Sequence, residues 1–261
     1  MPVAGPVLLV GCGRLGSAIA EGWLGTGTVS PADLLIRTRT TTPAVQAFAE
    51  QGVNVSPSSY DRPAAVVLSV KPANWREAVA GLALTPGVPV ISVMAGVRLD
   101  ALTEALPGHP VARVMPSTSV ASARGAAALL APDATAHQAA RTLFGPLSTL
   151  VEVPDDAAMD AATAVCGSAP AFIHAFVRGL AQGGVDQGLD PAAALALARG
   201  ALQAAAASSE DAAQSLEALI ARVASPKGTT EAGLNALAAG GLDSLAAAAV
   251  EAAVNRAREL G

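Results

Sequence analysis

The chain has 261 residues, enough for one large domain or two modest ones. Its formal net charge of -5, without a basic tail or a long charge run, argues against nucleic acid and against an anionic membrane surface as partners. Only 14% of the residues are charged and 52% are hydrophobic, which leaves apolar surface to be covered in an oligomer, although a general preference for alanine explains part of this balance.

The chain shows no sign of a signal peptide, because the first strand begins almost at once and no basic start precedes it. No apolar run reaches the roughly 20 residues of a membrane span without interruption. The two cysteines, Cys12 and Cys166, are too few for a disulfide framework or a metal site. We therefore expect a cytoplasmic protein without a bound metal.

The first strand, glycine turn and helix lie between residues 7 and 20. Branched apolar residues at Val7–Val10 are typical of a buried parallel strand, and a G-x-G-x-x-G sequence follows directly. In this motif Gly11 permits the turn, Gly13 lets the backbone approach a pyrophosphate, and Gly16 lets the helix pack close to the strand. The helix N-terminus offers N–H groups and a positive dipole end to phosphates. The motif predicts dinucleotide contacts from Gly11, Cys12, Gly13, Arg14, Leu15 and Gly16; the alternative is an ordinary glycine turn in an α/β core.

The second strand, Leu34–Ile36, bears on the choice of cofactor. An NAD-preferring site places an acid at the end of this strand, where it binds the ribose 2′-hydroxyl. Here Arg37, Thr38 and Arg39 follow the strand, and Asp33 lies at its other end. Guanidinium groups suit a 2′-phosphate. The sequence therefore predicts NADPH, with NADH possible, and the alternative is a solvated basic loop.

Strands alternate with helices from Val7 to about Val153, which predicts a mostly parallel sheet covered by helices on both faces. Further strands are expected at Val53–Val55, Ala65–Val70, Val88–Val93, Val111–Met115, Ala126–Leu130 and Thr149–Val153, and helices at Pro43–Glu50, Trp75–Leu84 and Leu99–Leu106.

After Pro154 only helical patterns follow. They are alanine-rich, so they bury little area each and gain by packing against a second copy. We expect an N-terminal Rossmann-type doubly wound sheet in residues 1–154 and an all-helical dimerisation domain in residues 155–261; the family resemblance given below implies that the second domain also binds the substrate. Its helices are expected at Asp156–Val165, Pro170–Gln187, Pro191–Ser208, Ala212–Ala224, Thr230–Ala239 and Leu242–Leu260.

Ligands of open α/β sheets bind beyond the carboxyl ends of the strands. Three predicted strands end in polar or small residues, at residues 70–72, 94–97 and 113–118. A lysine in such a place either contacts the nicotinamide ribose or extends from the surface. The cofactor-binding candidates from these ends are Val70, Lys71, Pro72, Ala95 and Gly96.

Several motifs in order along the chain are similar to those of the pyrroline-5-carboxylate reductase family. The resemblance covers nearly the whole length. It includes the G-x-G-x-x-G turn, and its most telling part is a C-terminal signature that begins at Ser225. The matching segments are Val70-Lys71-Pro72, Met94-Ala95-Gly96-Val97, Arg113-Val114-Met115-Pro116, Cys166-Gly167-Ser168-Ala169-Pro170-Ala171 and Ser225-Pro226-Lys227-Gly228-Thr229-Thr230-Glu231-Ala232-Gly233-Leu234.

The resemblance implies that NAD(P)H reduces the cyclic imine pyrroline-5-carboxylate to proline in a homodimer or an assembly of dimers. It makes Thr230 the catalytic residue, since its hydroxyl could bond the ring nitrogen. Backbone N–H groups at a helix start could hold the substrate carboxylate. The substrate-binding candidates are Ser225, Gly228, Thr229 and Thr230.

Three residues depart from the family pattern. Ser117 replaces the usual asparagine after Met-Pro, Ala169 replaces a glycine, and Lys227 replaces the first glycine of the C-terminal signature. If Lys227 takes a positive φ it carries strain, and if it points inward it could pair with a carboxylate.

Other two-domain reductases are the nearest alternatives. A β-hydroxyacid dehydrogenase would have a catalytic lysine in a G-x-x-G-x-x-x-N-K pattern, which the stretch from Gly167 to Phe172 lacks. An imine reductase with another substrate and a non-catalytic dinucleotide sensor on the same fold are the remaining ones.

Overall fold

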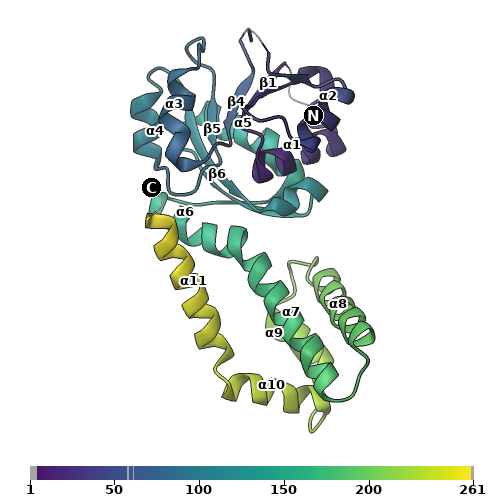
Figure 1. Ribbon diagram of the computed structural model, residues 1–261. Helices are drawn as coiled ribbons and strands as arrows, with labels where there is room; N and C mark the ends of the chain where they lie inside the picture. The colour runs from purple at the N-terminus through teal and green to yellow at the C-terminus, as the bar shows by residue number, and fades with distance from the viewer. Residues whose placement is uncertain (1–4, 58, 61, 260–261) are drawn as a thin grey trace. The chain divides into compact units, whose positions relative to one another are not determined.

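The computed structural model describes residues 5–57, 59–60 and 62–259 and divides into two compact units (Figure 1). The first unit comprises Met1–Ser168 and Ala252–Gly261, and the second comprises Ala169–Glu251. The division lies beyond the boundary expected near Pro154, because the first helix after that proline packs on the sheet. Met159 of this helix is fully buried in a cluster with side chains of two strands.

The first unit is built on an eight-stranded sheet in the order β3-β2-β1-β4-β5-β6-β7-β8. All neighbouring strands run parallel except β6 and β7, which pair antiparallel. The strands are β1 (Val7–Val10), β2 (Leu34–Arg37), β3 (Asn54–Val55), β4 (Ala65–Leu68), β5 (Val90–Ser92), β6 (Val111–Pro116), β7 (Gly125–Leu130) and β8 (Ser148–Glu152).

Both faces of the sheet are buried, as the continuous apolar runs predict. In β1, side chains alternate between the faces, so that Val7 and Leu9 join one core cluster and Leu8 and Val10 join the other. The first cluster is covered by α1 (Arg14–Thr26), α2 (Pro43–Glu50) and α5 (Ala134–Phe144), and the second by α3 (Trp75–Ala80) and α4 (Leu99–Ala105).

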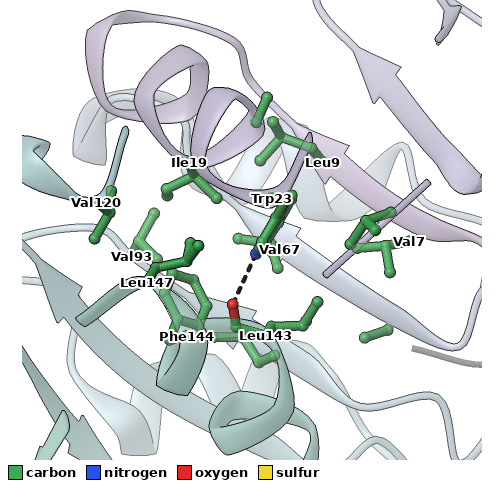
Figure 2. Close-up of a cluster of buried hydrophobic side chains, with 14 of the residues drawn as sticks. Val7, Leu9, Ile19, Trp23, Val67, Val93, Val120, Leu143, Phe144 and Leu147 are labelled. Carbon is green, nitrogen blue, oxygen red and sulfur yellow. Dashed lines mark hydrogen bonds between the residues drawn. The ribbon is translucent and has the colours of Figure 1, made fainter. Parts of the chain in front are cut away.

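The first cluster includes one polar connection between distant segments. Figure 2 shows Trp23 of α1 among Ile19, Phe144 and Leu147, with its indole Nε1–H donating to the carbonyl of Leu143 at 2.8 Å. A buried indole N–H needs such a partner. The contact holds α1, and with it the glycine turn that precedes α1, against the end of α5.

The helical region after Pro154 follows the predicted pattern. It contains α6 (Asp156–Ala162), α7 (Ala169–Asp186), α8 (Pro191–Ser208), α9 (Leu216–Val223), α10 (Thr229–Ala239) and α11 (Leu242–Glu259), with a π-helical turn at Thr163–Ser168 between α6 and α7. The predicted fold class is therefore confirmed: a Rossmann-like sheet is followed by helices.

Some predicted bounds are wrong by several residues. The helix expected at Ala212–Ala224 begins only at Leu216, because the Ser215 hydroxyl caps it by accepting a hydrogen bond from the backbone N–H of Ala218 at 3.2 Å. The helix expected at Trp75–Leu84 ends at Ala80. Leu260, the expected last residue of the C-terminal helix, lies outside the described residues.

The second unit buries very little of itself. Every one of its residues is described, and Val177, Ala194 and Ala198 are the only buried ones. By length and composition alone, the helical run Asp156–Asp186 could cross a membrane, and so could the bent pair α10–α11.

Candidate active site

The glycine turn after β1 has a conformation that side chains would prevent. Gly11 has a φ of 94°, its N–H donates to the carbonyl of Arg37 at 2.8 Å, and a Cβ there would lie 2.5 Å from the carbonyl oxygen of Ser69. A Cβ on Gly16 would lie 2.4 Å from the carbonyl oxygen of Gly11. These two glycines therefore shape the turn and the close approach of α1.

Gly13 differs, because a Cβ on it would meet nothing within 4 Å. It is exposed and forms the N-cap of α1, without a side-chain cap for the first N–H groups of the helix. Open space beside a helix N-terminus is what a pyrophosphate needs. The turn therefore leaves room for a pyrophosphate beside the N-terminus of α1.

The remaining motif residues have different surroundings. The Cys12 side chain is 4% exposed and belongs to the core, with its Sγ 3.4 Å from the Ser17 hydroxyl. Burial raises the pKa of this thiol. Leu15 is half-buried against the core, and Arg14 is exposed. Only the backbone of Cys12 is thus available to a cofactor.

A cavity of about 180 Å³ lies beside the turn, at the end of β2. The structure brings five predicted cofactor residues from three separate segments to its wall. Its lining residues are Val10, Gly11, Arg37, Thr38, Arg39, Val70, Glu77 and Ala78. The position suits the adenosine ribose of a dinucleotide whose pyrophosphate rests on the glycine turn.

Both arginines of this cavity contact the segment of α3. The Nη1 of Arg37 donates to the carbonyl of Gly81 at 2.6 Å and to the Tyr60 hydroxyl at 3.3 Å. The Nη1 and Nη2 of Arg39 donate to the two carboxylate oxygens of Glu77, each at 3.3 Å. Glu77 is a cavity residue that none of the sequence motifs indicates; the signal for it is an acid in the first turn of the helix after β4, the strand beside β1.

The other predicted strand-end residues lie around the same edge of the sheet. Lys71 is exposed and precedes a 3-10 turn that begins at Pro72. Ala95 is half-buried after β5, and Gly96 has a φ of 77°. The lining of the 180 Å³ cavity includes none of these four residues.

The end of β6 is tied to the helices that follow the sheet. The guanidinium of Arg113, which is 2% exposed, pairs with Asp156 at the start of α6, and Asp156 also accepts a hydrogen bond from the backbone N–H of Leu99. The Cys166 thiol donates to the carbonyl of Met115 at 3.1 Å. Burial raises the pKa of the Cys166 thiol, which keeps it protonated as a donor.

Ser117, the departure after Met-Pro, is buried and serves the sheet. Its backbone N–H donates to the carbonyl of Ala126 at 2.9 Å, and its hydroxyl accepts from the N–H of Ala126 at 3.2 Å. Ala169, the second departure, is the first residue of α7.

The loop before α10 belongs to the second unit. The N–H of Gly228 donates to the carbonyl of Ser225 at 2.9 Å, and a Cβ on Gly228 would lie 2.4 Å from the Ser225 hydroxyl oxygen. Lys227 has a φ of 60°, a strained conformation that costs a residue with a side chain about 1–2 kcal/mol. Its exposed backbone N–H, rather than its ammonium, pairs with a carboxylate: it donates to Oε2 of Glu231 at 2.7 Å.

This loop leads directly into the predicted substrate residues. Thr229 begins α10 and is exposed, and Gly228 is an N-cap without a side-chain hydrogen bond to the first N–H groups. Thr230 is half-buried and lines a cavity of about 700 Å³ inside the second unit, together with side chains of α8 and α9. The four predicted substrate residues thus lie within one loop and helix start.

Two family models match the chain. Residues 156–260 match pyrroline-5-carboxylate reductase dimerisation, and residues 6–96 match NADP oxidoreductase coenzyme F420-dependent. Among curated relatives, pyrroline-5-carboxylate reductase 3 of Danio rerio is 31% identical over 261 residues, covering 97% of this chain and 90% of the relative. The pyrroline-5-carboxylate reductase of Pisum sativum is 34% identical over 259 residues, covering 96% of this chain and 94% of the relative.

Solved structures give the same result. A pyrroline-5-carboxylate reductase from Coxiella burnetii has a TM-score of 0.87 and 26% identity, covering 98% of both chains. A pyrroline carboxylate reductase of Plasmodium falciparum with NADP bound has a TM-score of 0.82 over the whole of both chains, at 21% identity, which supports the fold. The glycine turn, the arginine-lined cavity, the helical second unit and these full-length matches lead to one conclusion: the chain belongs to the pyrroline-5-carboxylate reductase family.

Proposed function

We propose that this protein reduces pyrroline-5-carboxylate to proline with NADPH, and less readily with NADH. The observation that carries the proposal is a tight glycine turn with open space at Gly13 for a dinucleotide, in a chain that matches the family over almost its full length. The bound cofactor supplies the hydride for the imine carbon. The chain itself supplies binding, orientation and a polar partner for the ring nitrogen.

Each part of the chain has a defined task in this reaction. The turn around Gly13 and the start of α1 hold the pyrophosphate, and Arg37 and Arg39 face the adenosine ribose. The backbone N–H groups that follow Gly228 hold the substrate carboxylate, since no side chain caps them. The Thr230 hydroxyl bonds the ring nitrogen. Such a reduction needs positioning more than a strong base.

Two assays, one for each direction of the reaction, test the proposed activity directly. Oxidation of NADPH is followed with pyrroline-5-carboxylate, and NADP-dependent proline oxidation is followed at high pH. Turnover in both directions is the expected result. Dinucleotide binding without turnover contradicts the activity and favours a sensor, and preference for a six-membered cyclic imine contradicts the substrate.

The cofactor preference depends on Arg39. Replacement by aspartate, Arg39→Asp, places a carboxylate opposite Glu77 and removes a guanidinium from the cavity wall. We expect the KM for NADPH to rise at least about tenfold and the KM for NADH to change less than about threefold, because only the 2′-phosphate needs this cation. Steady-state kinetics with both cofactors measure the two values.

Arg76→Asp is the matched control. Arg76 is exposed on α3, beside Glu77, and does not line the cavity. The control variant should leave the ratio of the two KM values unchanged. Equal effects of Arg39→Asp on both cofactors contradict the NADPH assignment.

We also propose that the second unit pairs with a second copy. Its exposed apolar side chains include a stripe on α7 at Phe172, Phe176 and Leu180, which are 36%, 41% and 46% exposed. Their spacing of four residues places them on one helix face. The family match to a dimerisation region over residues 156–260 supports this partner.

Charge on that stripe should separate the copies. Phe176→Glu is expected to lower the mass in size-exclusion chromatography with light scattering from an oligomer to a monomer, because a desolvated carboxylate opposes burial. Gln203→Glu, at an exposed position on α8, adds the same charge and should leave the mass unchanged. If the wild-type protein is itself a monomer, the proposed pairing with a second copy is contradicted.

The cytoplasm is the proposed location. Both cysteines are free thiols, Cys12 buried and Cys166 half-buried, as in proteins of a reducing compartment. Neither nucleic acid nor a membrane is proposed as a partner, given the net charge of -5 without a basic cluster in the sequence.

A further inference from the structure

Glu77 has a place in the dinucleotide cavity that the motif did not anticipate. It lies in the first turn of α3 and lines the same 180 Å³ cavity as Arg37, Thr38 and Arg39. Its carboxylate meets the guanidinium of Arg39 end on, accepting hydrogen bonds of 3.3 Å from Nη1 and Nη2. The planar fork of Arg39 is the part that would otherwise bind a phosphate.

Arg39 is the arginine on which a 2′-phosphate depends most. Arg37 is already fixed, because its Nη1 donates to the carbonyl of Gly81 at 2.6 Å and to Tyr60. A Cβ on Gly81 would lie 2.8 Å from Nη2 of Arg37, so this guanidinium also fills its own niche. Arg39 is open to solvent, with a side chain 69% exposed, and its known partner is Glu77, which is 72% exposed.

A phosphate that binds Arg39 must therefore compete with a carboxylate already present. An exposed ion pair is weak and breaks without large cost, so the site still accepts the phosphate. The displaced carboxylate then remains near a dianion, and like charges at this distance repel each other. Glu77 thus reduces the advantage that the two arginines give to a phosphorylated ribose.

For a dinucleotide without the phosphate the same carboxylate is useful. A 2′-hydroxyl donates its hydrogen bond to an acid in sites that prefer NAD, where the acid stands at the end of the second strand. Here the second strand ends in Arg37, and Glu77 brings a carboxylate to the same cavity from the other wall.

We propose that Glu77 is a specificity-determining residue that competes with the 2′-phosphate for Arg39 and accepts the ribose 2′-hydroxyl when that phosphate is absent. The proposal rests on the proposed dinucleotide function of this cavity. It makes the enzyme usable with both cofactors and assigns the balance between them to one carboxylate.

Equilibrium binding of NADPH and NADH to the full-length protein tests the proposal without the imine substrate. Titrations followed by nicotinamide fluorescence, in low salt, give both Kd values. For Glu77→Gln we expect the Kd for NADPH to fall about three- to tenfold and the Kd for NADH to rise about two- to fivefold, since one exposed charge contact is removed. Glu50→Gln, an exposed acid at the end of α2 and outside the cavity, is the control and should change neither value.

A double variant tests the competition itself. In an Arg39→Gln background, Glu77→Gln should improve NADPH binding by a smaller factor than it does with Arg39 present, because the contested guanidinium is gone and only the direct repulsion of the phosphate is relieved. The inference is overturned if Glu77→Gln lowers the Kd for NADPH by the same factor with and without Arg39. It is also overturned if the variant changes the Kd values of both dinucleotides equally or changes neither. Failure to bind either dinucleotide in the wild-type protein overturns the proposed function as well, whereas binding without imine reduction contradicts the proposed function alone.

Discussion

Replacement of Thr230 by alanine will lower kcat/KM for pyrroline-5-carboxylate about a hundredfold and leave NADPH affinity within twofold of the wild type. A hydroxyl that bonds a ring nitrogen as charge changes there contributes in this range. Thr230 is half-buried at the start of α10, in the second unit, so its loss leaves the glycine turn untouched. Steady-state kinetics and fluorescence titration measure the two quantities separately.

Ser244→Ala on α11 is the control, because it removes an exposed hydroxyl from the same unit. Its kcat/KM should equal that of the wild type. Thr230→Ser should restore most of the activity, since it returns the hydroxyl. Wild-type activity in Thr230→Ala removes this residue from the mechanism.

Two alanine substitutions in the glycine turn will differ in their effect on stability. Gly16→Ala is expected to lower the free energy of unfolding by about 3 kcal/mol or more, since its Cβ would lie 2.4 Å from a backbone oxygen in a buried place. Gly13→Ala should leave the unfolding midpoint within about 2 °C, because a Cβ there meets nothing. Denaturant and thermal unfolding measure both.

Gly13→Ala should nevertheless raise the Kd for NADPH at least about tenfold, because the new methyl group occupies the space beside the N-terminus of α1. Gly25→Ala is the control: a Cβ there also meets nothing within 4 Å, and Gly25 lies one residue before the end of α1, at the opposite end of the helix from the glycine turn. Full NADPH affinity in a folded Gly13→Ala protein contradicts the assignment of the pyrophosphate to this turn.

Much of the first unit could be predicted because each strand carries its own evidence. β1 and β2 are continuous apolar runs buried on both faces, and the interval between them holds a helix with Ile19 and Trp23 on its inner side. The glycine turn could be predicted for the same reason, since only a residue without a Cβ fits the close backbone contacts at Gly11 and Gly16. Local chemistry determines local structure at these places.

Other features depend on contacts between segments far apart in the chain. The pairing of Arg39 with Glu77 joins residues 38 positions apart, and no local pattern distinguishes Glu77 from another exposed acid on a helix. Likewise, the sequence indicates no partner for the charge of Arg113 within an apolar strand, and the structure places Asp156 beside it. The sequence could raise the positive φ of Lys227 only as one possibility, because a lysine gives no local signal for the left-handed conformation that glycine favours.

The scarcity of buried residues in the second unit has a thermodynamic consequence. All residues of this unit are described, and only Val177, Ala194 and Ala198 are buried. So little burial cannot by itself offset the conformational entropy of four helices and part of a fifth. If a second copy supplies the missing burial, association and folding of this region are one equilibrium, and mass action governs both. The melting temperature then rises with protein concentration, and a subunit at high dilution loses the ordered start of α10 before it loses the sheet.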